Sequence, residues 1–253
     1  ADNTSGGYNI SMGYYAMRHN TTGGYNVALG RYAMRGTTAY AGSNYNVALG
    51  YQSMYSINGG VDNVSIGRSA LYDITSGSYN IGVGMEALAN ITTGNDNMAF
   101  GTQAMLNATN TDDYNIAMGY GAMAGTAAYI ATDYNVAIGY YAMNSINGGD
   151  NNIAFGNMAL FDNTTGYNNI AIGDNALPNN TSGYQNIAIG DETDISNTTG
   201  DYNISIGYWA GRAGTTVNDN VAIGRYSLYQ NLGGYNTGVG YAAGAGVSGP
   251  TYT

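Results

Sequence analysis

The stretch Tyr134-Asn135-Val136-Ala137-Ile138-Gly139 decides the fold of this chain, because variants of it recur along nearly the whole sequence. Each variant has an asparagine, an apolar residue in all copies but the one with Thr237, a small residue, a second apolar residue and a glycine. The fourteen copies end at Gly13, Gly30, Gly50, Gly67, Gly84, Gly101, Gly119, Gly139, Gly156, Gly173, Gly190, Gly207, Gly224 and Gly240. Successive glycines lie 16 to 20 residues apart, most often 17. A short fixed period is typical of a repeat protein whose units stack on one another.

Side chains in the repeated stretch alternate in the way that a β-strand requires. Val136 and Ile138 lie on one face of the expected strand, and Asn135, Ala137 and Gly139 lie on the other. β-branched residues suit a packed, pleated surface, whereas the repeated glycines and the short period exclude a long helix. The sequence therefore predicts an all-β protein, a parallel β-solenoid or β-roll of about 14 coils with a repeat of about 17 residues.

The remainder of each coil follows the glycine. Residues 140–143, Tyr-Tyr-Ala-Met, predict a second short strand or a bend, and residues 163–166, Asn-Thr-Thr-Gly, are typical of the turn that closes a coil. Asparagines repeated at strand spacing can form a continuous ladder of side-chain amides, so we expect a structural role for them. A tyrosine precedes the ladder asparagine in eight coils and is expected to cover the backbone, with sugar stacking as the alternative.

The strand face opposite the Val and Ile positions carries small residues, which indicates that other parts of the protein pack closely against that face. Either the coil has a thin interior, or another chain packs there. A further apolar stripe lies four residues after the repeat glycine, at Met17, Met34, Met54, Leu71, Leu88, Met105, Met123, Met143, Leu160, Leu177 and Leu228. Two apolar stripes on a thin coil favour a homotrimer, since closed cyclic symmetry is the common solution for oligomers. The alternative is a monomeric solenoid with both stripes inside.

The chain is predicted to form one repeat domain over residues 8–247, after a lead-in of residues 1–7 and before a tail of residues 248–253. Two coils carry insertions, at residues 36–44 and 125–133, which resemble each other and indicate that a block of five coils was duplicated. Insertions on a regular scaffold are where specific contacts concentrate. Tyr40 and Tyr129, one in each insertion, are therefore candidates for receptor contact, and a tolerated surface insertion is the alternative.

Charge excludes several kinds of partner. The formal net charge is −10 at pH 7, and the only strongly basic residues are six arginines, with no lysine. Binding to nucleic acid or to an anionic membrane surface is therefore not expected. No apolar run approaches the length of a membrane span, so membrane insertion is not expected either. The absence of cysteine excludes disulfides but is compatible with either an extracellular or a cytosolic location.

The residues that could bind a metal ion lie in one acidic segment. Asp174 and Asp191 follow the repeat glycine in consecutive coils, and Glu192 and Asp194 lie beside them, with Asp194 in place of the apolar stripe residue. We predict a divalent cation there, Ca²⁺ by its preference for oxygen ligands, with a hydrated acidic patch as the alternative. No catalytic residue is predicted: His19, the single histidine, lies in a loop sequence, and no nucleophile motif accompanies it.

The strings at residues 163–173 and 134–139 resemble the repeats of two related groups, bacteriophage tail fibres and the heads of trimeric autotransporter adhesins of the YadA type. The resemblance covers about residues 8–247, and the seventeen-residue period with its Asn-Thr-Thr-Gly turn favours the phage group. It implies a left-handed parallel β-roll in a trimeric, extracellular fibre that attaches to a host-surface glycan or protein. A bacterial adhesin head, a purely structural filament and a tailspike-like polysaccharide hydrolase are the alternatives, the last supported only by the acidic segment.

Overall fold

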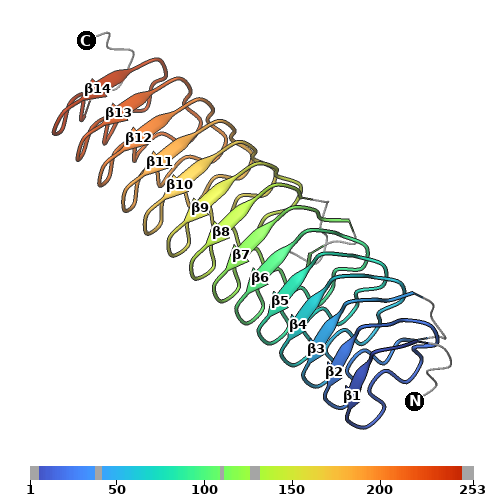
Figure 1. The fold of residues 1–253 in the computed structure, drawn as a ribbon. Coiled ribbons are helices and arrows are strands. Elements are labelled where there is room, and N and C mark those ends of the chain that lie inside the picture. Colours follow the sequence, from blue (N-terminus) through green and yellow to red (C-terminus); the bar gives the residue numbers. More distant parts are fainter. Residues whose placement is uncertain (1–5, 38–41, 109–110, 126–131, 247–253) are drawn as a thin grey trace. The chain divides into compact units, whose positions relative to one another are not determined.

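A computed structural model describes residues 6–37, 42–108, 111–125 and 132–246 of the chain. These residues form fourteen strands of three residues each and, within the described ranges, no helix. The chain divides into two compact units, Ala1–Asp133 and Tyr134–Thr253. The first contains β1 (Ile10–Met12), β2 (Val27–Leu29), β3 (Val47–Leu49), β4 (Val64–Ile66), β5 (Ile81–Val83), β6 (Met98–Phe100) and β7 (Ile116–Met118). The second contains β8 (Val136–Ile138), β9 (Ile153–Phe155), β10 (Ile170–Ile172), β11 (Ile187–Ile189), β12 (Ile204–Ile206), β13 (Val221–Ile223) and β14 (Thr237–Val239) (Figure 1).

Neighbouring strands within each unit pair in parallel and in strict register. Ile170 of β10 lies beside Ile187 of β11, and the small residues Ala171 and Ala188 lie beside each other. The same register recurs from β1 to β7 and from β8 to β14, and it pairs apolar with apolar and small with small residues except where Val221 lies beside Thr237. Because one turn of chain separates each pair, the fold is a parallel β-solenoid. The predicted all-β class, the stacked coils and the repeat length are confirmed, whereas the homotrimer stays a prediction.

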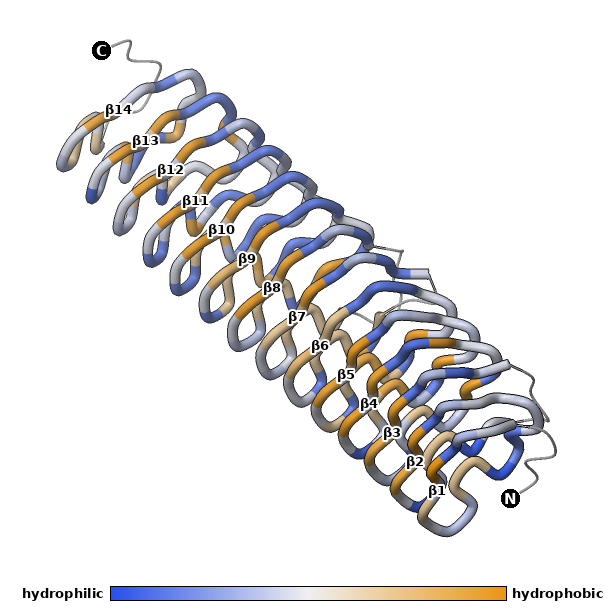
Figure 2. Tube along the Cα trace, viewed as in Figure 1, coloured by the Kyte–Doolittle hydropathy of each residue, from blue (hydrophilic) through white to orange (hydrophobic). Residues whose placement is uncertain are grey.

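The interior of each coil is thin, because the small strand residue points inward. Ala137 and the stripe residue Met143 are both fully buried, and the absence of a long side chain at position 137 leaves room for the methionine. Val136 and Ile138 lie on the outer face, where they are half-buried. Of the two explanations for the small residues, the thin interior is therefore the right one. The Met and Leu stripe is inside, and the Val and Ile stripe remains outside along the strands. Figure 2 shows that hydrophobic residues recur at the strands of successive coils.

The predicted asparagine ladder is present in both units. Asn152 is fully buried, and its side-chain oxygen accepts hydrogen bonds from the backbone N–H of Asn169 at 2.9 Å and from the Asn169 side-chain amide at 3.2 Å. Its own amide donates to Oδ1 of Asn135 at 3.1 Å and to the carbonyl oxygen of Gly166 at 2.8 Å. Both polar ends of the side chain are thus fully used, so the ladder lets each coil hold its neighbours through buried hydrogen bonds.

The segment after each repeat glycine is a bend and not a second strand. Tyr141 and Met143 adopt left-handed backbone angles, with φ of 51° and 49°. The Met143 N–H donates to the carbonyl oxygen of Ala159 in the next coil at 2.9 Å, which keeps this unusual conformation hydrogen-bonded. The repeat glycine itself is required at the strand end: Gly156 has a φ of 143°, and a β-carbon there would collide with the backbone oxygen of Gly173.

Candidate functional site

The four carboxylates of the acidic segment lie in two different environments. Asp174 and Asp191 are exposed in consecutive coils, as predicted, and Oδ1 of Asp191 accepts a hydrogen bond from the Asp174 N–H at 3.4 Å. Glu192 is half-buried at the surface, whereas Asp194 points into the coil and is only 3% exposed. Among the described residues no three acidic, histidine or cysteine side chains gather in a metal-binding arrangement. The structure thus brings Asp174 and Asp191 together and separates Asp194 from them.

Asp194 borders a small cavity in the second unit, which polar and apolar residues line together. The cavity has a volume of about 10 Å³, close to the space that one water molecule needs. Oδ2 of Asp194 is buried and has no hydrogen-bond partner. Burial raises the pKa of Asp194 to about 8, against the smaller opposing effect of a hydrogen bond with Asn197. Residues that line the cavity include Asn203, Ser205, Gly211, Asn220, Leu228 and Asn231.

This cavity exists because two consecutive coils lack the apolar stripe residue. Asp194 stands where Leu177 stands one coil earlier, and Gly211 stands there one coil later, before the stripe resumes at Leu228. Only Asp194 was predicted to be an exception. Gly211 was the second indication in the sequence, because a residue without a side chain at a stripe position leaves unfilled the space that Leu or Met fills in other coils.

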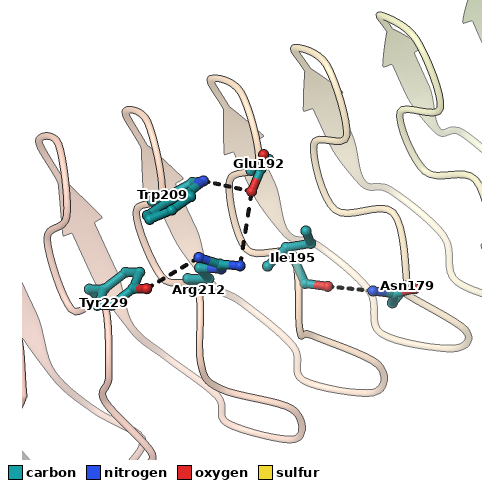
Figure 3. A network of polar contacts seen from close by, with 6 residues as sticks. All are labelled: Asn179, Glu192, Ile195, Trp209, Arg212 and Tyr229. Atoms are coloured by element: carbon teal, nitrogen blue, oxygen red, sulfur yellow. Dashed lines mark hydrogen bonds and ion pairs between the residues drawn. The ribbon is translucent and has the colours of Figure 1, made fainter.

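A polar and aromatic network lies around Glu192, two residues before Asp194 in the chain (Figure 3). Oε2 of Glu192 accepts a hydrogen bond from the Trp209 indole N–H at 2.6 Å and lies 4.0 Å from Nη2 of Arg212. The Arg212 guanidinium lies 4.1 Å from the centre of the Trp209 ring and donates to the Tyr229 hydroxyl at 3.2 Å. In the neighbouring coils, Asn179 donates to the backbone oxygen of Ile195 at 2.6 Å. Glu192 is therefore engaged by a cation and an indole.

One arrangement of an arginine and three tyrosines is found in the first unit and is called the first arginine–tyrosine cluster. Arg31 donates to the hydroxyl of Tyr32 at 3.3 Å, and its guanidinium lies 4.8 Å from the Tyr32 ring centre. Tyr14, one coil earlier, and Tyr51, one coil later, lie 5.7 Å and 6.0 Å from the same guanidinium. Both rings meet Tyr32 edge-on, at interplanar angles of 72° and 69°.

The second arginine–tyrosine cluster repeats this arrangement in the second unit. Arg225 donates to the hydroxyl of Tyr226 at 3.3 Å, and its guanidinium lies 4.8 Å from that ring and 5.6 Å from Tyr208. Tyr208 and Tyr241 meet Tyr226 edge-on, at 82° and 90°. The two clusters were not predicted, because their residues come from three successive coils and become neighbours only through the register.

Tyrosines that precede the ladder asparagine line another edge of the coils. Tyr8, Tyr25 and Tyr45 form a stack with ring centres 4.9 Å and 5.0 Å apart. About half of the Tyr25 and Tyr45 surface remains exposed, at 51% and 56%. These rings cover the backbone only in part and leave a face open. Tyr40 and Tyr129, the predicted contacts in the insertions, lie outside the described residues.

The outer side of the strands carries a row of partly exposed apolar residues, called here the apolar strand face. Within the second unit Ile153 is 41% exposed, Phe155 54% and Ile172 38%. Further members of this face are Ile66 and Met118 in the first unit and Ile223 in the second. Because the strands are in register, these side chains form continuous rows in each unit.

Comparison with protein-family models, with curated proteins and with solved structures finds no match for this chain. In the ranges that the structure describes, no helix has the length and apolar character needed to cross a membrane.

Proposed function

We propose that this chain is a segment of an extracellular attachment fibre, with a bacteriophage tail fibre as the particular setting and a glycan or protein of the host surface as the partner. One observation carries the proposal. The apolar strand face stays outside a solenoid that has already filled its own interior with alanine, methionine and leucine. Contiguous apolar surface on a soluble protein marks an interaction site. A fibre of identical chains would cover this face.

A homotrimer about the solenoid axis is the arrangement proposed for this fibre. Each chain presents the same face in every coil, so a cyclic arrangement repeats one contact along the whole length of the units. The arginine–tyrosine clusters and the stacked tyrosines are not part of the apolar strand face and would remain accessible in such an assembly. Multiple copies of a weak binding site then act together, which raises the overall affinity without any new contact.

Disruption of the apolar strand face is expected to dissociate the trimer. The double change Ile153→Glu and Phe155→Glu places charges on the outer side of β9, where desolvation of a carboxylate is costly. Sedimentation equilibrium should give a trimer mass for the unchanged chain and a monomer mass for the variant. The matched control is Thr199→Glu, at an exposed turn position, which should remain trimeric. A monomer at all concentrations of the unchanged chain would contradict the proposed assembly.

Attachment is tested by binding of the fluorescently labelled fibre to a panel of bacterial strains that differ in surface polysaccharide. We expect retention on a subset of strains, with no release of reducing ends from the polysaccharide. Trimer formation without retention on any strain would instead indicate a spacer filament, and retention on animal cells or matrix alone would favour a bacterial adhesin. Release of reducing ends would indicate a hydrolase.

A further inference from the structure

The two arginine–tyrosine clusters are built alike although they lie in different compact units. In each, an arginine and the tyrosine that follows it stand directly after a repeat glycine, and one tyrosine from each adjacent coil completes the group. Arg31 and Arg225 both make a 3.3 Å hydrogen bond to the following tyrosine and both lie 4.8 Å from its ring centre. Such agreement at two separate places shows that the coil geometry yields one defined surface unit.

Both central arginines carry a charge that no neighbouring carboxylate offsets. Within the described residues Arg68 pairs with Glu86 at 3.5 Å and Arg212 with Glu192 at 4.0 Å, but neither Arg31 nor Arg225 has an ion-pair partner. Both are exposed. In a chain with a net charge of −10, these are places where positive charge is left open to solvent. The hydrogen bond to the adjacent tyrosine raises the pKa of each arginine, so both remain cationic.

The surrounding rings leave both a flat apolar surface and the edge of the guanidinium available. Tyr51 is 42% exposed beside Arg31, and Tyr241 is 73% exposed near Arg225. Tyr14 packs on Tyr15 and Tyr208 stacks on Trp209, so Tyr51 and Tyr241 are the rings with the more open faces. A guanidinium binds a carboxylate through paired N–H groups in its plane, while exposed aromatic faces accept apolar ring surfaces. A ligand that fits must therefore combine an acidic group with a ring that has an apolar face.

We propose that each arginine–tyrosine cluster is a binding subsite for an acidic saccharide, whose acidic group contacts the arginine and whose sugar ring stacks on a neighbouring tyrosine. This inference rests on the proposed attachment function and names its ligand class. An anionic lipid surface fits less well, because the overall negative charge of the chain would be repelled by the surface around the headgroup. Carboxylated and sulfated sugars share the required chemistry and are distinguished in the experiment.

Isothermal titration calorimetry tests the proposal with short oligogalacturonate, oligosialate and a sulfated oligosaccharide, each against a neutral oligosaccharide of similar length. The unchanged chain is expected to bind at least one acidic probe with two sites per chain and to bind the neutral one at least about tenfold more weakly. Arg31→Ala and Arg225→Ala should each remove one site, and the double variant should remove both. Arg→Lys at either position keeps the charge but loses the planar fork, so it should weaken that site.

The matched control is Arg68→Ala, because Arg68 occupies the same place in its coil as Arg31 and Arg225 but is paired with Glu86 and has no tyrosine after it. Its binding should equal that of the unchanged chain. The inference is overturned if no acidic probe binds, if neutral and acidic probes bind equally, or if Arg68→Ala weakens binding as much as Arg31→Ala. Melting temperatures verify that the variants are folded. Fibres that adhere to cells but bind no acidic probe would refute the inference alone, whereas absent adherence would refute the attachment function.

Discussion

Replacement of Asn152 by leucine is expected to lower the free energy of unfolding by about 4 kcal/mol, because it leaves two buried N–H donors of Asn169 without an acceptor. The Asn169 N–H loses its acceptor, and the Asn169 side-chain amide loses one of its two acceptors. The carbonyl oxygen of Gly166 loses one of its two side-chain donors and keeps Asn163. Each unsatisfied buried group costs about 1–3 kcal/mol. Chemical denaturation followed by circular dichroism measures the difference.

Asn157→Leu is the matched control for this prediction. Asn157 lies five residues further along the chain and is exposed, and its amide makes a single 2.8 Å hydrogen bond to Asp174. The same chemical change at this position should cost less than about 1 kcal/mol. Equal effects of the two substitutions would show that the ladder does not stabilise the solenoid through buried hydrogen bonds.

Raising the pH from 4 to 9 is expected to destabilise the chain by an amount on the order of 5 kcal/mol through Asp194 alone. Its pKa is raised to about 8 by burial in the folded chain, against about 3.9 in an unfolded chain. Between these two values the folded chain binds more protons than the unfolded chain, so stability falls as the pH rises. The contribution is fully present below about pH 4 and is lost by the time the pH passes 8.

Asp194→Asn isolates this effect from the other carboxylates, since an amide of the same shape does not titrate. The variant should be less sensitive to alkaline pH than the unchanged chain, and above pH 8 it should melt at a higher temperature. Melting temperatures measured from pH 4 to 9 for both proteins provide the test. If the two curves are parallel over this range, Asp194 is ionised in the folded chain and the cavity holds something that compensates its charge.

Much of the architecture could be predicted because it depends on period alone. Asn135 and its equivalents recur at the spacing of one coil, and identical residues at that spacing must lie beside one another in a parallel stack. The strands, the ladder and the closing turns follow from this. The acidic residues Asp174 and Asp191 were likewise expected to lie in adjacent coils, because both follow the repeat glycine.

The tertiary structure decided which side of each strand is the inside. Ala137 and Val136 both belong to non-polar rows, so alternation did not distinguish the core face from the outer face. Side-chain volume distinguishes the two faces. A thin coil has room for Met143 or for a second large side chain from the strand, but not for both, and alanine therefore turns inward. The same constraint turns Asp194 into the interior, where its Oδ2 has no hydrogen-bond partner.

The tertiary structure also decided which side chains of adjacent coils are in contact. Arg31 meets Tyr14 and Tyr51 only because register places three coils side by side. The sequence by itself determined the repeat, the solenoid and the ladder, since these need nothing beyond spacing and residue type. The apolar strand face, the cavity at Asp194 and the arginine–tyrosine clusters depend on side-chain volume and on neighbours in adjacent coils, and packing in three dimensions decided them.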